Sequence, residues 1–170
     1  AACTWVEIAD WIPAMLTGTE APDKLVVGVC AAGHKAMYND DWGGYPDAKF
    51  LGKLAGGLGE LRGRLAEEAL TIDKSVGGLT AEWAERTGLP QGIPVAVGAF
   101  DAHLGGVGAG IAPGTLVKII GTSKCDMMVA PASRPLPDIP GLCGIVRGSI
   151  LPNAFGMEAG QCAVGDIFSW

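Results

Sequence analysis

Two short apolar runs, each ending in small and polar residues, constrain the fold of this chain most. The first, residues 95–100 (VAVGAF), leads to Asp101, and the second, residues 116–120 (LVKII), leads to a Gly-Thr-Ser triplet. A short apolar run bounded by turn-forming residues is typical of a buried strand. In sheet-based α/β folds, functional groups gather where strands end, because the chain turns there and can face a ligand. The sequence therefore predicts a carboxylate beside a small polar loop, a combination suited to phosphoryl transfer to an alcohol.

Asp101 opens a segment of small residues, residues 101–110 (DAHLGGVGAG). Four glycines in this segment would weaken an isolated helix by about 1 kcal/mol each relative to alanine, so we expect close packing or approach to a ligand. An aspartate at a helix start is commonly only a capping residue, and its anionic form is favoured there. His103, on the same segment, is interpreted as structural.

The triplet Gly121, Thr122 and Ser123 is interpreted as a phosphate contact, with two hydroxyls and nearby backbone N–H groups as donors. A Gly-Thr-Ser triplet alone is a weak signal, because many turns between strands contain one. The sequence has no GxxxxGK[ST] motif, which excludes a P-loop enzyme for this chain.

Composition limits the class of protein. The chain has 170 residues, 49% of them hydrophobic, which is enough for a sizeable core. Its net charge of −6 argues against nucleic acid as the main partner, since binding a phosphate backbone needs clustered cations. The five cysteines lack the short Cys and His spacings of a zinc site, so no protein metal site is predicted. With no signal peptide and no apolar run of membrane-spanning length, we expect a cytoplasmic protein without membrane contact.

Lys35 lies in a small-residue segment, residues 30–38, whose composition is not that of a typical surface. We therefore expect Lys35 to be partly buried with a polar partner, for which a sugar oxygen would serve. Residues 156–170 are predicted to form a helix preceded by a loop, with Glu158 near the helix start. A glutamate in a first turn usually only compensates the helix dipole.

The rest of the chain carries ordinary signals for helices, strands and caps. Thr80 and Asp47 are candidate N-caps, and Gly88 suits a helix end. Pro13 is expected to kink its helix or end it early. Further helices are predicted over residues 1–16, 47–54 and 58–70, and further strands over residues 24–29, 125–129 and 142–150.

Several segments resemble the FGGY carbohydrate kinases, and among them most closely the ribulokinases. The likeness runs through nearly the whole chain. One departure is Lys124, where ribulokinases usually carry threonine, and this lysine is expected either to contact phosphate or to point to solvent. The matching segments are CAAGHKAMY (30–38), LTAEWAERTGLPQGIPVAVGAFDAH (79–103), GAFDAHLGGVGAG (98–110), LVKIIGTSKCDMMVAP (116–131) and GMEAGQCAVGDIFSW (156–170).

This resemblance implies an α/β fold of the ribonuclease H-like (actin-like ATPase) class, with parts of two domains flanking a catalytic cleft. Residues 1–111 would be the C-terminal part of an N-terminal sugar-binding domain. Residues 112–170 would begin a C-terminal nucleotide-binding domain. An internal segment of this kind lacks one phosphate loop and most of the adenine pocket, so we expect it to be inactive alone.

The resemblance also implies an activity: transfer of the ATP γ-phosphate to the terminal hydroxyl of L-ribulose, giving L-ribulose 5-phosphate in L-arabinose catabolism. Asp101 would be the catalytic base and contact the sugar, with Lys35 and Glu158 as further sugar ligands. Gly121, Thr122 and Ser123 would contact the phosphates of ATP, bridged by Mg²⁺ without a dedicated protein cage. Two alternatives stay open, a kinase for another ketopentose or polyol and a non-catalytic sugar- or nucleotide-binding module. The oligomeric state is also open, a homo-oligomer included.

Overall fold

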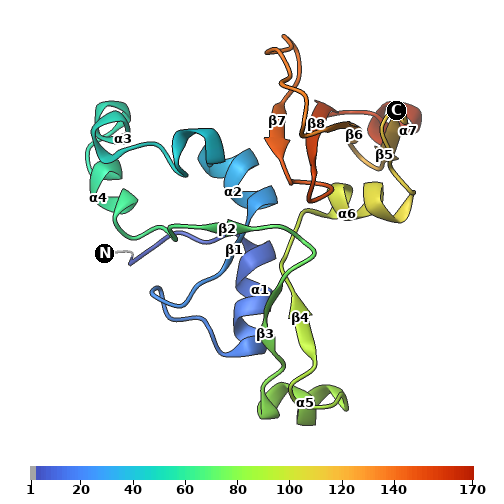
Figure 1. Ribbon diagram of the computed structural model, residues 1–170. Coiled ribbons are helices and arrows are strands. Elements are labelled where there is room, and N and C mark those ends of the chain that lie inside the picture. Colours follow the sequence, from blue (N-terminus) through green and yellow to red (C-terminus); the bar gives the residue numbers. More distant parts are fainter. Residues whose placement is uncertain (1–2) are drawn as a thin grey trace. The chain divides into compact units, whose positions relative to one another are not determined.

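The computed structural model describes residues 3–170, which fall into two compact units, one ending at Ala99 and the other formed by residues 100–170 (Figure 1). Helices and short strands are mixed in both units. The assignment of residues 1–111 and 112–170 to the two domains of the kinase family stays a prediction. Within the described part of the chain, no helix is long and apolar enough to cross a membrane.

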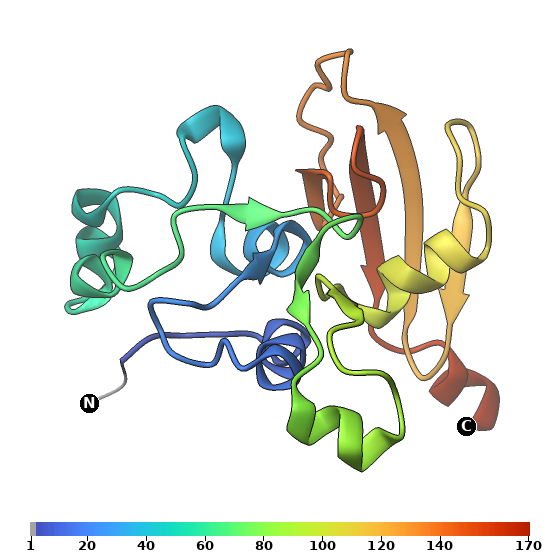
Figure 2. The same cartoon turned by 60° about the horizontal axis from the view of Figure 1, so that its bottom comes forward.

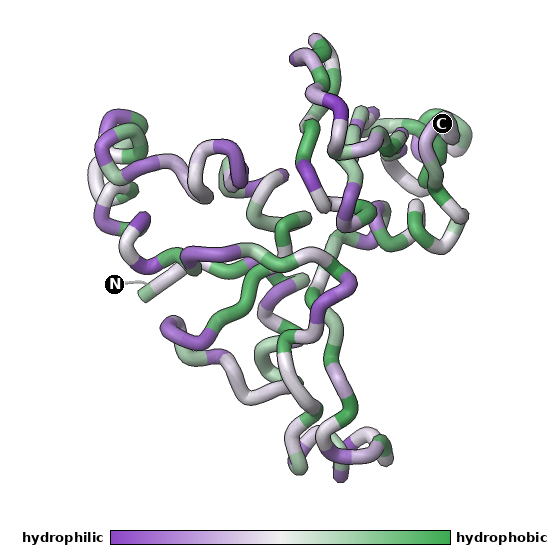
Figure 3. The backbone as a smooth tube through the Cα atoms, viewed as in Figure 1, coloured by the Kyte–Doolittle hydropathy of each residue, from purple (hydrophilic) through white to green (hydrophobic). Residues whose placement is uncertain are grey.

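The first unit contains two small strand pairs. Strand β1 pairs with β2 in parallel, and β3 pairs with β4 antiparallel. The apolar run from β1 into α2 is green in Figure 3, and its residues are buried. The elements are α1 (Ile8–Thr17), β1 (Val27–Gly28), α2 (Val29–Ala36), the 3₁₀ helix η1 (Asp40–Trp42), α3 (Ala48–Leu54), α4 (Leu58–Arg62), β2 (Ala69–Leu70), β3 (Ser75–Gly78), α5 (Ala81–Thr87) and β4 (Pro94–Ala96).

Helix α1 contains a proline in its interior. Pro13 has no N–H, so the carbonyl of Ala9, four residues earlier, has no helical donor. The helix nevertheless continues to Thr17, where Gly18 closes it with a left-handed conformation at φ 71°. A Cβ added at Gly98 would lie 2.6 Å from the Ala9 carbonyl carbon, so only glycine permits this close approach. Of the two effects predicted for Pro13, the early end of the helix does not occur.

Several predicted caps are present. The N–H of Phe50 donates to the Asp47 carboxylate at 2.6 Å, at the start of α3. The Thr80 hydroxyl accepts from the N–H of Trp83 at 3.5 Å, and Gly88 ends α5 in a left-handed conformation at φ 72°. The second predicted helix of this region is shorter than expected, because α4 ends at Arg62 and the chain then turns towards β2.

The second unit is built on a four-stranded antiparallel sheet with strand order β5-β6-β8-β7. Helix α6 packs against β5 and β6 (Figure 2). The buried cluster beneath it consists of Ile111, Val117, Met127, Val129, Ile150 and Ala154. The elements are α6 (Asp101–Gly108), β5 (Val117–Ile120), β6 (Lys124–Pro131), β7 (Gly144–Arg147), β8 (Ala154–Gln161) and α7 (Gly165–Ser169).

The helix predicted over residues 156–170 is wrong for most of its length. Residues up to Gln161 form β8, which pairs with β6 on one side and β7 on the other, and only Gly165–Ser169 is helical. Glu158 therefore lies within a strand rather than in the first turn of a helix. Its local sequence contains good helix formers, but hydrogen bonding to two neighbouring strands determines the conformation.

Candidate active site

Asp101 is the first residue of α6, and the chain reaches it through an extended Phe100. The side chain is exposed, and its Oδ1 accepts a hydrogen bond from the N–H of Ala102 at 2.7 Å. This bond satisfies one of the donors that a helix start leaves open. Among residues 3–170, the Oδ2 atom of Asp101 has no hydrogen-bond partner, so this oxygen is available to accept a proton from a ligand.

Glycines allow α6 to lie close to the sheet. A Cβ at Gly105 would lie 3.0 Å from Cδ1 of Ile119, and one at Gly106 would lie 3.1 Å from Cε of Met127. Both distances are tighter than ordinary contacts. Close packing therefore explains the glycines at these two positions. It is one of the two reasons predicted for this glycine-rich segment, the other being approach to a ligand.

Glu158 lies in the middle of β8, directly opposite Met127 of β6 and Gly144 of β7. Its side chain is 23% exposed, and Oε2 lies 3.5 Å from Nε2 of His103. The main-chain carbonyl of Glu158 accepts from the N–H of Cys143 at 2.7 Å. The strand pairing fixes the backbone of Glu158, while the side chain reaches the helix that begins at Asp101.

His103 is almost completely buried, with 2% of its surface exposed. Its ring meets Phe100 edge to face, with centroids 5.8 Å apart. Burial lowers the pKa of His103, against the opposing influence of the Glu158 and Asp101 carboxylates. Sequence reasoning treated this histidine as structural and missed its contact with Glu158. The available signal was a polar ring within a small, apolar segment, since a buried histidine needs a polar neighbour.

The triplet Gly121–Ser123 forms the turn of the hairpin between β5 and β6. Its backbone is tied down, because Gly121 donates to the Ser123 carbonyl at 2.8 Å and Val164 donates to the Thr122 carbonyl at 2.9 Å. All three residues are exposed. Within residues 3–170 the hydroxyls of Thr122 and Ser123 have no hydrogen-bond partner, so both are available as donors to an anion.

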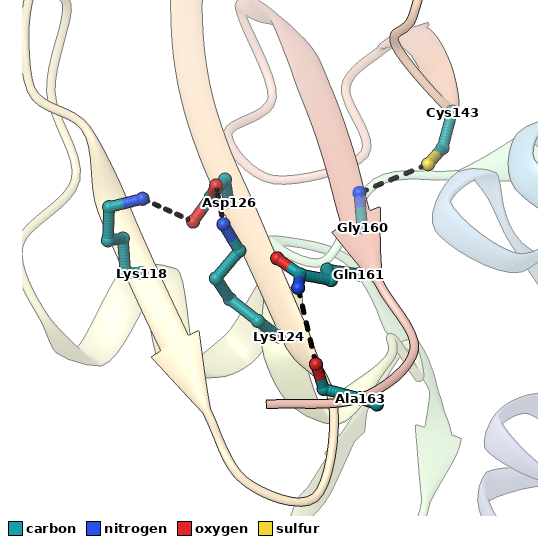
Figure 4. A network of polar contacts seen from close by, with 7 residues as sticks. All are labelled: Lys118, Lys124, Asp126, Cys143, Gly160, Gln161 and Ala163. Carbon is teal, nitrogen blue, oxygen red and sulfur yellow. Dashed lines mark hydrogen bonds and ion pairs between the residues drawn. The ribbon is translucent and has the colours of Figure 1, made fainter. Parts of the chain in front are cut away.

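Lys124 follows this turn and belongs to a small charged group (Figure 4). Its Nζ lies 2.7 Å from Oδ2 of Asp126, and Nζ of Lys118, across the hairpin, lies 3.0 Å from Oδ1. The hydrogen bonds from Lys124 and Lys118 lower the pKa of Asp126, and the hydrogen bond to Asp126 raises the pKa of Lys124. Two cations thus share one carboxylate, and one positive charge remains in excess beside the turn. The donor hydroxyls and this charge fit the phosphates of a nucleotide.

Lys35 lies in the last turn of α2 and is exposed. The partly buried position expected from its small neighbours is therefore wrong. The first turn of the same helix, Val29–Ala32, is buried, which explains the apolar composition. Lys35 also lines a cavity of about 270 Å³ in the first unit, whose other lining residues are mostly apolar, including Leu51 and Leu54.

Within the second unit, the structure brings Asp101, His103 and Glu158 into one neighbourhood, and the phosphate-loop candidates form the turn of its β5–β6 hairpin. Lys35 belongs to the first unit. The roles predicted for these residues stay predictions.

Comparisons with known proteins give relatives along the whole chain. A ribulokinase from Vibrio parahaemolyticus is 47% identical over 171 residues, covering 99% of this chain and 30% of the relative. A ribulokinase from Shouchella clausii is 44% identical over 168 residues, covering 98% of this chain and 28% of the relative. The chain thus spans less than a third of these relatives. No protein-family model matches it.

A solved structure has the same fold. The xylulose kinase from Rhodospirillum rubrum superposes on the whole chain, over 32% of its own length, with a TM-score of 0.73 and 23% identity. This likeness confirms the predicted α/β fold of the actin-like ATPase class.

Proposed function

The chain resembles the FGGY carbohydrate kinases, and most closely the ribulokinases, over its whole length, and on that premise we propose that the whole protein is an ATP-dependent sugar kinase. Its substrate would be L-ribulose and its product L-ribulose 5-phosphate, and it would act in L-arabinose catabolism in the cytoplasm. The observation that carries this proposal is 47% identity to a ribulokinase across 99% of the chain.

The sugar would be held by groups of opposite hydrogen-bonding character. The Lys35 ammonium donates to sugar oxygens, and the Glu158 carboxylate accepts from sugar hydroxyls. Asp101 would accept the proton of the terminal hydroxyl as that oxygen attacks phosphorus. The exposed carboxylate with one oxygen without a hydrogen-bond partner among the described residues supports this role.

The phosphates would be held by the Gly121–Ser123 turn, through the hydroxyls and backbone N–H groups of Thr122 and Ser123, while the Gly121 N–H closes the turn on the Ser123 carbonyl. ATP supplies the transferred phosphoryl group, and Mg²⁺ neutralises phosphate charge when both are bound. The fixed backbone and available hydroxyls of this turn support the assignment, because preorganised donors stabilise anionic groups without reorganisation.

The test is ADP release by the whole protein with Mg-ATP and a panel of L-ribulose, D-ribulose, xylulose and glycerol. We expect turnover to be highest with L-ribulose. Asp101→Asn should lower kcat by roughly 100- to 10,000-fold, the usual contribution of a general base. Asp138→Asn, which neutralises an exposed carboxylate in a loop of the same unit, is the matched control and should retain activity.

The outcomes separate the alternatives. Turnover that prefers another sugar would keep the mechanism and change the substrate. A folded protein that binds ATP but turns over none of the sugars would refute the kinase assignment and favour a binding module. Full activity of Asp101→Asn would refute the role of that carboxylate as base.

A further inference from the structure

Besides its own strand β8 and the two flanking strands, Glu158 contacts helix α6. His103 reaches it from α6, with Nε2 and Oε2 3.5 Å apart. The two side chains differ in exposure. His103 is buried, whereas Glu158 is partly exposed. The Glu158 side chain is therefore the one of the pair that solvent reaches.

The orientation of the His103 ring is restricted on two sides. Phe100 contacts the ring edge to face. The backbone of His103 belongs to a helix that packs directly on the sheet. A buried ring with a lowered pKa is neutral near pH 7, and a neutral imidazole with its proton on Nε2 donates to a carboxylate. His103 thus has the chemistry to hold Glu158 in one orientation.

The thiol of Cys125 also interacts with the Glu158 carboxylate. Cys125 of β6 lies opposite Gly160 in register, two residues along β8 from Glu158, on the same face of the sheet. Burial, and then the charge and hydrogen bonding of Glu158, raise the pKa of Cys125 to about 12, so the thiol keeps its proton. A protonated thiol is a weak donor to a carboxylate.

We propose that His103 is a positioning residue that fixes the Glu158 carboxylate so that it can accept a hydrogen bond from a sugar hydroxyl. This inference rests on the proposed function, because it assigns a second residue to the same sugar site. The alternative is that His103 only fills space between α6 and the sheet. The two roles predict different results when the imidazole is removed. If His103 positions Glu158, sugar affinity falls. If His103 only fills space, stability alone falls.

The experiment uses the whole protein, four test variants and one control variant. His103→Leu keeps much of the volume and removes the donor, whereas His103→Gln restores an N–H donor near the position of Nε2. Glu158→Gln and the double variant His103→Leu/Glu158→Gln test whether the two residues act as a pair. Val129→Ala is the control, since it weakens the buried cluster of the same unit and leaves the imidazole and the carboxylate unchanged.

We expect His103→Leu to raise the KM for L-ribulose and its Kd, measured by calorimetry without ATP, by roughly 10-fold, in line with the loss of one hydrogen bond to a charged group. The KM for ATP should not change. His103→Gln should recover most of the sugar affinity, and the double variant should bind no more weakly than Glu158→Gln alone. Equal effects of His103→Leu and Val129→Ala on sugar binding, or additive effects in the double variant, would overturn the proposal.

A spectroscopic measurement separates this inference from the proposed function. In ¹⁵N spectra of histidine-labelled protein, assigned with His103→Gln, the His103 resonance should report a neutral ring protonated at Nε2 and should shift in Glu158→Gln. Absence of sugar turnover by the wild-type protein counts against the proposed function. An unchanged His103 resonance in Glu158→Gln counts against the contact itself and overturns the positioning role.

Discussion

Asp10 of α1 is a buried carboxylate whose ionisation opposes folding. It is 3% exposed, and its Oδ1 accepts from the N–H of Gly28 at 2.8 Å. Burial raises its pKa from 3.8 to about 6, with a smaller contribution from the charge of Glu7, while the Gly28 hydrogen bond acts in the opposite direction. At about 1.4 kcal/mol per pH unit, this displacement corresponds to roughly 3 kcal/mol of unfolding free energy.

The sign follows from proton affinity. The folded chain binds the Asp10 proton more tightly than the unfolded chain does, so Asp10 contributes most to stability below pH 3.8. That contribution is lost as the pH rises through about 6, because the carboxylate must then ionise while buried. In Asp10→Asn the amide oxygen still accepts from Gly28, but the side chain never ionises.

We therefore expect Asp10→Asn to be more stable than the wild type by up to ~3 kcal/mol at about pH 8, and equally stable at about pH 3. The assay is denaturant unfolding of both proteins across this range, with amide hydrogen exchange of Gly28 as a local probe. Asp23→Asn, an exposed carboxylate in the same unit, is the control and should parallel the wild type. The reasoning would be refuted if the unfolding free energies of the wild type and Asp10→Asn changed in parallel with pH. It would also be refuted if the wild type were the more stable of the two at high pH.

Three further predictions concern glycines. Gly98→Ala should lower the unfolding free energy by about 3 kcal/mol in thermal or denaturant unfolding, because its Cβ would meet the backbone of Ala9. A Cβ at Gly108 of α6 would meet nothing within 4 Å, so Gly108→Ala should raise stability by up to about 1 kcal/mol. Gly106→Ala, whose Cβ would press on Met127, should gain less than Gly108→Ala, and an equal gain would contradict the packing of α6.

Much of the local structure could be predicted from neighbouring residues alone. The placement of Asp101 at a helix start, the caps at Thr80 and Gly88, and the hairpin around residues 121–123 all depend on signals within a few positions. Turn residues, caps and short apolar runs act through adjacent backbone groups, so they are visible in the sequence. The kinase-like fold followed from the resemblance of longer segments rather than from these local signals.

The predictions that were wrong concern features that depend on residues distant in sequence. Lys35 is exposed because burial in α2 is confined to its first turn, Val29–Ala32, whereas Lys35 lies in the last turn. Glu158 lies in a strand because β6 and β7 pair with β8 on both sides. The contact between Glu158 and His103 exists only because α6 crosses a sheet whose strands come later in the chain. The sequence by itself determined which residues begin and end many elements, whereas only the tertiary structure decided which face each residue presents and which carboxylate meets the buried imidazole.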